Sequence, residues 1–183
     1  MTSSSPLLRL ATPGDVPAIA TLMAASVRSE FPRLHTARQT ESAATYISRV
    51  DPVLVQDGTY FVHEANSTVV ACGGWSRRAK LFADGAAADD DLRLLDPATE
   101  PARIRAMFTH GDWTRRGLAR AILQASERAA AEAGFHSLIL MATLPGVPLY
   151  RAYGFTEIDR RDLVMPDGVS TAGVLMTRAI QIA

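Results

Sequence analysis

The chain has 183 residues, is 48% hydrophobic and carries a formal net charge of zero, which predicts one globular domain with a sizeable core. The absence of a basic block argues against a general nucleic-acid or anionic-membrane partner, and no apolar run approaches the roughly 20 residues that span a bilayer. The first six residues lack signal-peptide features and Cys72 is the only cysteine, so we expect a cytoplasmic protein with a disordered segment at 1–6 and a folded domain at 7–183.

The N-terminal half is predicted to begin with a strand at residues 7–11 and to continue with two helices. Asp15 is an acceptor at the start of the first helix, and the pattern breaks near residues 31–35. Thr36 and Gln39 form a capping box that starts the second helix. We expect Asp51-Pro52 to end that helix, because the residue before a proline disfavours the helical conformation.

A β-hairpin is predicted next, with strands at residues 59–65 and 68–75. Asn66-Ser67 between them is typical of a tight turn. Gly73-Gly74 inside the second strand indicates a bulge or a close backbone approach. Residues 80–101 show little periodicity and hold three successive aspartates, so we interpret them as a long loop with at most a short helical turn.

The C-terminal half is predicted to contain a strand, a helix and a parallel strand. Residues 102–109 alternate with period two, placing Ile104, Ala106 and Phe108 on one face and Arg103, Arg105 and Met107 on the other. A helix follows from Leu118 to the C-capping Gly134, and the apolar run 138–142 fits a strand buried on both faces. This order predicts a right-handed crossover, followed by a short helix at 148–154 and a terminal hairpin at 156–180.

The loop between the strand at 102–109 and the following helix is the best candidate for a ligand site. A helix start leaves backbone N–H groups without partners and carries a positive dipole, so it favours phosphate. Gly117 lets a diphosphate approach the backbone, and Arg115, Arg116 and Arg120 add charged donors. The sequence has neither the Walker-type phosphate loop nor the glycine fingerprint of dinucleotide-binding folds.

Two motifs resemble those of the Gcn5-related N-acetyltransferase (GNAT) family. The loop reads Thr114-Arg-Arg-Gly117-Leu-Ala119, where the family has Gln or Arg, two variable residues, Gly, one variable residue and Gly or Ala. Downstream, Leu149-Tyr150-Arg-Ala-Tyr-Gly154-Phe155 is similar to its Leu-Tyr-x-x-x-Gly-Phe. Thr114, Thr143 and Gly111 depart from the pattern, since the family has Gln or Arg, Asn and Pro there.

The resemblance implies a fold, a cosubstrate and a set of site residues. The fold is a single mixed α/β domain whose mostly antiparallel sheet has two splayed central parallel strands flanked by helices. The cosubstrate is acetyl-CoA, and no metal is implied. Tyr150 is the implied acid that protonates the leaving thiolate, although it could merely pack against the sulfur. The implied coenzyme-binding residues are Met107, Phe108, Thr109, Arg115, Arg116, Gly117, Leu118, Ala119, Arg120 and Thr143.

The sequence does not identify the general base that the reaction requires. No acidic residue lies at 102–109, where the family sometimes has one, so a relayed water is the alternative. Arg103 and Arg105 would favour a carboxylate-bearing acceptor if they face the cleft, and would otherwise form a solvated strand face. His110 is expected to make a structural hydrogen bond, and Cys72 to be a buried, inert thiol.

The function implied is transfer of an acetyl group from acetyl-CoA to a primary amine, with a small molecule favoured over a protein acceptor. A homodimer is possible, since dimers are common in the family. The alternative is a non-catalytic acyl-CoA-binding regulatory domain, which the missing base supports. O-acyl transfer, or transfer of another acyl chain, is a third interpretation.

Overall fold

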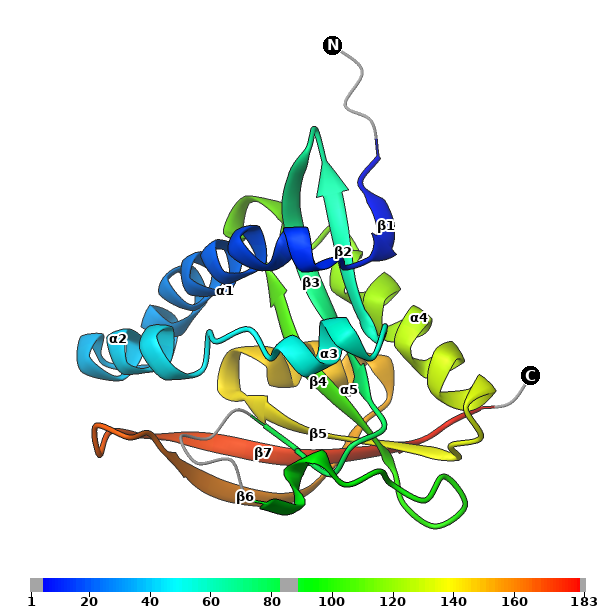
Figure 1. Cartoon of the computed structure of the whole chain (residues 1–183). Coiled ribbons are helices and arrows are strands. Elements are labelled where there is room, and N and C mark those ends of the chain that lie inside the picture. The colour runs from blue at the N-terminus through cyan, green and yellow to red at the C-terminus, as the bar shows by residue number, and fades with distance from the viewer. Residues whose placement is uncertain (1–4, 83–88, 182–183) are drawn as a thin grey trace.

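A computed structural model describes residues 5–82 and 89–181 and contains one seven-stranded sheet (Figure 1). The strand order is β1-β2-β3-β4-β5-β7-β6, and within the described residues only β4 and β5 pair in parallel. This agrees with the predicted mostly antiparallel sheet and central parallel pair. The strands are β1 (Leu7–Leu10), β2 (Tyr60–Ala65), β3 (Thr68–Ser76), β4 (Ala102–Thr109), β5 (Ser137–Thr143), β6 (Thr156–Val164) and β7 (Ser170–Ala179).

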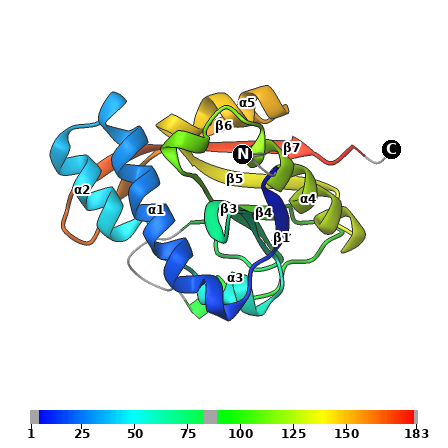
Figure 2. The same cartoon turned by 90° about the horizontal axis from the view of Figure 1, so that it is seen from above.

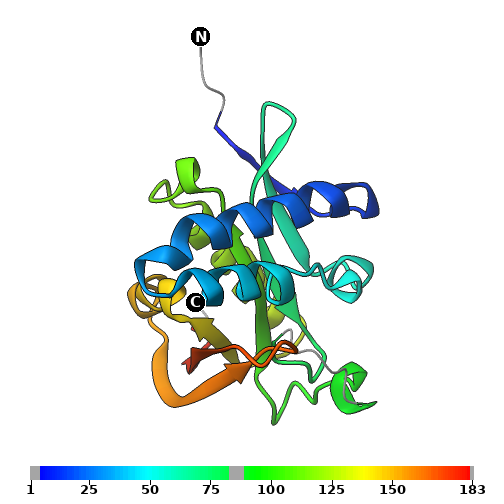
Figure 3. The ribbon, with the colours of Figure 1, turned by 90° about the vertical axis from the view of Figure 1, so that its left-hand side faces the viewer.

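Helices cover both faces of this sheet. On one face, α1 (Val16–Glu30) and α3 (Pro52–Gln56) form an apolar cluster with β2 and β3, and α2 (Ala37–Tyr46) lies beside α1 (Figures 2 and 3). On the other face, α4 (Leu118–Glu132) and α5 (Val147–Tyr153) share a second cluster with β4, β5 and β7. The two clusters make the sheet the central layer of a three-layer arrangement.

The sheet divides between its two parallel strands. β4 and β5 pair only at Ala102 with Leu138 and at Arg103 with Ile139, whereas β5 and β7 pair along the whole of β5. Beyond Arg103 the two strands part, and in Figure 1 β2 and β3 run in a different direction from β5 and β7. The divergence, or splay, leaves the edge of β4 that faces β5 without a neighbouring strand.

Of three predictions about helix ends, one is confirmed, one is wrong and one is confirmed in part. Thr36 and Gln39 form the predicted capping box, with Gln39 N donating to Thr36 Oγ1 at 3.2 Å. Asp51-Pro52 does not end α2, which stops at Tyr46; it begins α3, because Asp51 accepts from the N–H of Val53 and proline is tolerated in a first turn. Asp15 stands at the N-cap position of α1 and is an acceptor there, as predicted, but its carboxylate accepts from Thr12 N and binds Arg9 instead of capping an N–H of α1.

The predicted alternation of β4 is also wrong beyond Arg105. Arg105 lies opposite Gly74 and Phe108 opposite Cys72, so two residues of β4 face one of β3. This is a β-bulge, and it brings Met107 rather than Ala106 to the face of Ile104. In β5 the prediction of burial on both faces fails as well, because only alternate residues are buried.

The predicted long loop is largely irregular where it is described. A short 3-10 helix (Asp89–Leu92) lies within it, and Arg78 bridges Leu94. The alanines at 86–88, together with residues 1–4 of the predicted disordered segment, lie outside the described residues. In the part of the chain that the structure describes, we find no helix that is long and apolar enough to cross a membrane.

Candidate functional site

The predicted phosphate-binding loop joins β4 directly to α4. Its backbone turns through left-handed conformations at Arg115 (φ 62°) and Gly117 (φ 81°), and α4 begins at Leu118. Ala121 N donates to Gly117 O at 3.0 Å, so the N–H groups of residues 118–120 precede the first regular helical hydrogen bond. The loop therefore has the local structure of an anion-binding helix start.

The surroundings of this helix start suit a phosphate group. No heavy atom lies within 4 Å of the position that a Cβ on Gly117 would occupy, so the backbone is open there. Arg115, Arg116 and Arg120 are all exposed. The guanidinium of Arg116 lies 4.5 Å from the ring centre of Trp113, which orients it without neutralising its charge.

The other predicted coenzyme-binding residues lie at the ends of the two parting strands. Met107, Phe108 and Thr109 end β4, and Thr143 ends β5; all four are half-buried. Because β4 and β5 are parallel, their carboxyl ends lie at the same edge of the sheet, next to the starts of the helices that follow them. The fold thus brings the predicted residues to one end of the splay.

Tyr150 lies on α5, with its ring in the cluster between α4, α5 and the sheet. Its side chain packs edge-on against Phe155, with ring centres 5.8 Å apart, and the residue is only 8% exposed. A Cβ on Gly146 would lie 3.0 Å from Tyr150 Cε2, so that glycine makes room for the ring. Burial raises the pKa of Tyr150 above its ordinary value, which keeps the phenol protonated at neutral pH.

The two arginines of β4 are neither solvated nor free to bind a carboxylate. Arg105 is 4% exposed, forms an ion pair with Asp51 at 3.1 Å and donates to Lys80 O at 3.0 Å. Arg103 is half-buried and donates to the carbonyl groups of Ala79 and Pro101. Sequence reasoning missed the Arg105–Asp51 pair because the two residues are 54 positions apart.

The turn between β6 and β7 is attached to α2 on the α1 face of the sheet. Ser42 Oγ donates to Asp167 Oδ1, and Gln39 Nε2 donates to Ser170 O, both at 2.9 Å. An apolar cluster beneath these contacts joins α1, α2 and the turn, and Phe108 at the end of β4 packs against it. Phe108 is therefore covered on this face by side chains of the helices and of the turn.

Other candidate residues behave as structural groups. Asp112 N donates to His110 Nδ1 at 3.3 Å, as expected for a loop contact. Cys72 is buried, and burial raises the pKa of its thiol to about 12, which confirms an unreactive cysteine. Among residues 5–82 and 89–181, no group of three or more His, Cys, Asp or Glu side chains could hold a metal ion.

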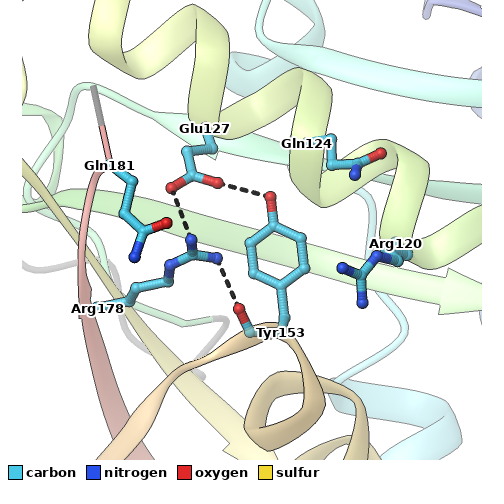
Figure 4. A pocket seen from close by; sticks show the side chains of 6 residues that line it. All are labelled: Arg120, Gln124, Glu127, Tyr153, Arg178 and Gln181. Carbon is cyan, nitrogen blue, oxygen red and sulfur yellow. Dashed lines mark hydrogen bonds and ion pairs between the residues drawn. The ribbon is translucent and has the colours of Figure 1, made fainter. Parts of the chain in front are cut away.

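A polar pocket of about 270 Å³ lies along α4 (Figure 4). Glu127 accepts from Tyr153 Oη at 2.6 Å and forms an ion pair with Arg178 at 3.4 Å. The guanidinium of Arg120 lies 5.6 Å from the ring centre of Tyr153. Arg120 belongs both to this pocket and to the helix start, so the pocket begins where the loop ends. Its lining is Arg120, Gln124, Glu127, Tyr153, Arg178 and Gln181.

Comparisons with known proteins agree with this geometry. Residues 21–155 match the acetyltransferase (GNAT) family, whereas no curated protein matches the chain. A GCN5-related N-acetyltransferase from Rhodopseudomonas palustris is similar in structure, with a TM-score of 0.72, 18% identity and 98% of both chains covered.

Two further structures share the fold. The paia N-acetyltransferase from Thermoplasma acidophilum, solved in complex with coenzyme A, has a TM-score of 0.67 at 13% identity over 96% of this chain and 99% of that one. The ribosomal-protein-alanine N-acetyltransferase from Brucella melitensis has a TM-score of 0.60 at 16% identity over 94% and 99%. Identities this low establish the fold alone.

Proposed function

Because this chain belongs to the acetyltransferase (GNAT) family, we propose that it transfers an acetyl group from acetyl-CoA to a primary amine. The observation that carries the proposal is the junction of the open helix start at Gly117 with the unpaired edge of β4. The first binds a diphosphate, and the second accepts an extended chain through backbone hydrogen bonds. Coenzyme A carries both groups, because its extended pantetheine arm is bonded to its diphosphate.

The coenzyme is held by this chain's own residues in three parts. Backbone N–H groups at 117–120, with Arg115 and Arg116 beside them, bind the diphosphate. Met107, Phe108, Thr109 and Thr143 line the two sides of the pantetheine arm. The pocket beside Arg120 takes the 3′-phosphoadenosine end, because its two arginines and one glutamate leave it net cationic.

Bound acetyl-CoA supplies a thioester whose carbonyl carbon the amine nitrogen attacks, so that a C–N bond forms and the C–S bond breaks. A backbone N–H of β4 donates to the thioester oxygen as negative charge develops there. The Tyr150 hydroxyl donates a proton to the departing sulfur. The phenol is protonated at neutral pH, as an acid must be, although the burial that raises its pKa also makes it a weaker proton donor.

The proton of the attacking amine leaves through water rather than directly to a carboxylate. β4 contains no acidic residue, and the half-buried carboxylate of Asp51, which pairs with Arg105 of β4, is neutralised by that arginine. An amine close to its ordinary pKa of ~10.4 is mostly protonated at pH 7, so the reaction should accelerate as pH rises. An acyl-CoA-binding domain without catalysis would show no such dependence.

The acceptor is proposed to be a small molecule. Phe108 lies beneath an apolar cluster formed by α1, α2 and the β6–β7 turn, and two hydrogen bonds hold that turn against α2. These contacts restrict the acceptor side to a compact amine. A carboxylate on the acceptor is not required, because the guanidinium of Arg105 already has a carboxylate partner.

Turnover tests the proposal. Release of the coenzyme A thiol is followed with a panel of amines and short peptides, for the wild type and for Tyr150→Phe. We expect release with at least one small amine and a rate that is roughly 10²- to 10⁴-fold lower in the variant. Acetyl-CoA binding without turnover on any acceptor would instead support a regulatory domain, and mass spectrometry of the products distinguishes N- from O-acylation.

A further inference from the structure

A buried tyrosine outside the predicted site contacts the bulge of β4. Tyr60, the first residue of β2, donates from its hydroxyl to Ala106 O at 2.6 Å and is 1% exposed. Ala106 has a φ of 52°, a left-handed conformation that non-glycine residues rarely adopt. The hydrogen bond therefore joins a rigid core side chain to a backbone unit in an uncommon conformation.

The two adjacent glycines of β3 make this contact possible. A Cβ on Gly74 would lie 2.2 Å from Thr59 O, 2.9 Å from Tyr60 Cα and 3.0 Å from Tyr60 Cδ2, so the missing side chain lets the start of β2 and the Tyr60 ring lie close to β3. A Cβ on Gly73 would lie 2.2 Å from Met107 Sδ, so this glycine makes room for the side chain that the bulge redirects. Gly74 thus leaves room for Tyr60, and Gly73 leaves room for Met107 at the bulge.

The contact fixes the direction of one backbone N–H. The described peptide bonds are all trans, so the carbonyl of Ala106 and the N–H of Met107 point in opposite directions. Tyr60 approaches Ala106 from the β2 side of the sheet, and β5 lies on the other side of β4. Holding the carbonyl toward Tyr60 turns the N–H of Met107 away from β2 and β3, toward the splay.

We propose that Tyr60 is a positioning residue for acetyl transfer, which holds the Ala106–Met107 peptide so that the N–H of Met107 donates to the thioester oxygen. The inference rests on the proposed function, since it assigns the backbone donor that the reaction needs. Tyr60 itself does not touch the coenzyme. Displacing such a donor by about 1 Å is expected to lower the rate on the order of 100-fold.

The test compares Tyr60→Phe with Thr59→Val. Thr59 is also 1% exposed, and its hydroxyl donates to a backbone carbonyl, that of Leu54 in α3, at 3.2 Å. Both variants remove one buried hydroxyl from neighbouring positions, but only the first acts on β4. Coenzyme A affinity is measured by calorimetry, unfolding by thermal denaturation, and the thioester carbonyl by infrared difference spectra of bound [1-¹³C]acetyl-CoA.

We expect the wild type and Thr59→Val to lower the carbonyl stretching frequency of bound acetyl-CoA, because a hydrogen bond weakens the C=O bond. The Kd of Tyr60→Phe for coenzyme A should be within about threefold of the wild-type Kd, because the helix start still sets the affinity. The variant should nevertheless lose the shift in carbonyl frequency. On an acceptor that the wild type uses, its kcat should fall on the order of 10- to 100-fold while KM for acetyl-CoA changes little.

The possible failures are distinguishable. If the wild type does not bind acetyl-CoA, the proposed function fails. If it binds and Tyr60→Phe retains the frequency shift, the positioning role is refuted while the proposed function stands. If Tyr60→Phe does not fold, the test uses NMR spectra of the wild type. The amide proton of Met107 should shift downfield when acetyl-CoA replaces coenzyme A, and an unchanged resonance overturns the inference.

Discussion

Replacing Gly117 with glutamate should abolish tight coenzyme A binding without unfolding the protein. The substitution forces a residue with a Cβ into a left-handed conformation, which costs about 1–2 kcal/mol of stability. No heavy atom lies within 4 Å of that Cβ, so no packing penalty is added. The fold should therefore survive, since ordinary domains are stable by about 5–15 kcal/mol.

The effect on binding is larger and has an electrostatic origin. A carboxylate about 4 Å from a phosphate charge repels it by ~1 kcal/mol in water and by ~4 kcal/mol at the effective dielectric constant near a protein surface. An intermediate value of about 3 kcal/mol corresponds to a Kd roughly 100-fold higher. Steric loss of close backbone approach adds to this repulsion.

Gly58→Glu is the matched control for this experiment. Gly58 has a φ of 67° and, like Gly117, no heavy atom within 4 Å of its Cβ position, but it follows α3 on the opposite face of the sheet from α4. Calorimetry with coenzyme A and thermal denaturation should show equal destabilisation of the two variants and weak binding only in Gly117→Glu. Equal affinities for coenzyme A in both variants would refute the assignment of the phosphate site.

Three other predictions follow from specific contacts. Because burial raises the pKa of Tyr150, any alkaline decline of kcat that depends on its phenol should lie above pH ~10. A decline near pH 8 that disappears in Tyr150→Phe would contradict the raised pKa. The hydrogen bond from Arg9 lowers the pKa of Asp15, so the carboxylate of Asp15 stabilises the fold above the unfolded pKa of ~3.9 and loses this effect as pH falls. In urea unfolding, Asp15→Asn should lower the free energy of unfolding by about 1–2 kcal/mol at pH 7 and by progressively less below pH 4. A loss of stability that does not change with pH would contradict the ion pair. Gly73→Ala should lower the free energy of unfolding by about 1–3 kcal/mol, because the added methyl group overpacks against Met107 Sδ. A double-mutant cycle with Met107→Ala checks that contact, since the loss should be smaller when the Met107 side chain is removed.

Local chemistry in the sequence was sufficient to locate most secondary structure and the loop that we propose binds phosphate. The capping box at Thr36, the turn at Asn66-Ser67 and the C-cap at Gly134 depend on neighbouring residues, so each could be recognised directly. The openness of the backbone at Gly117 could likewise be predicted from its missing Cβ, whereas its left-handed conformation is known only from the structure.

The errors have two sources: the helix start at Asp51-Pro52 is a local signal that was misinterpreted, since Asp51 accepts from the N–H of Val53, and the other contacts join residues that are distant in the sequence. Asp51 begins a helix instead of ending one, and its carboxylate also neutralises Arg105 on a strand 54 positions away. The bulge at Ala106 reverses the faces of Met107 and Phe108 because the register with β3 places two residues against Gly73. Strand register depends on pairing across the sheet, which a periodic pattern within one strand does not encode.

The sequence by itself thus determined a mixed α/β domain and the position of the helix start at Leu118, because caps, periodicity and turn residues act over a few residues. Only the tertiary structure decided which backbone groups face the space between β4 and β5, and which charges are already neutralised. Those properties depend on contacts such as Tyr60 with Ala106, which form when distant strands come together.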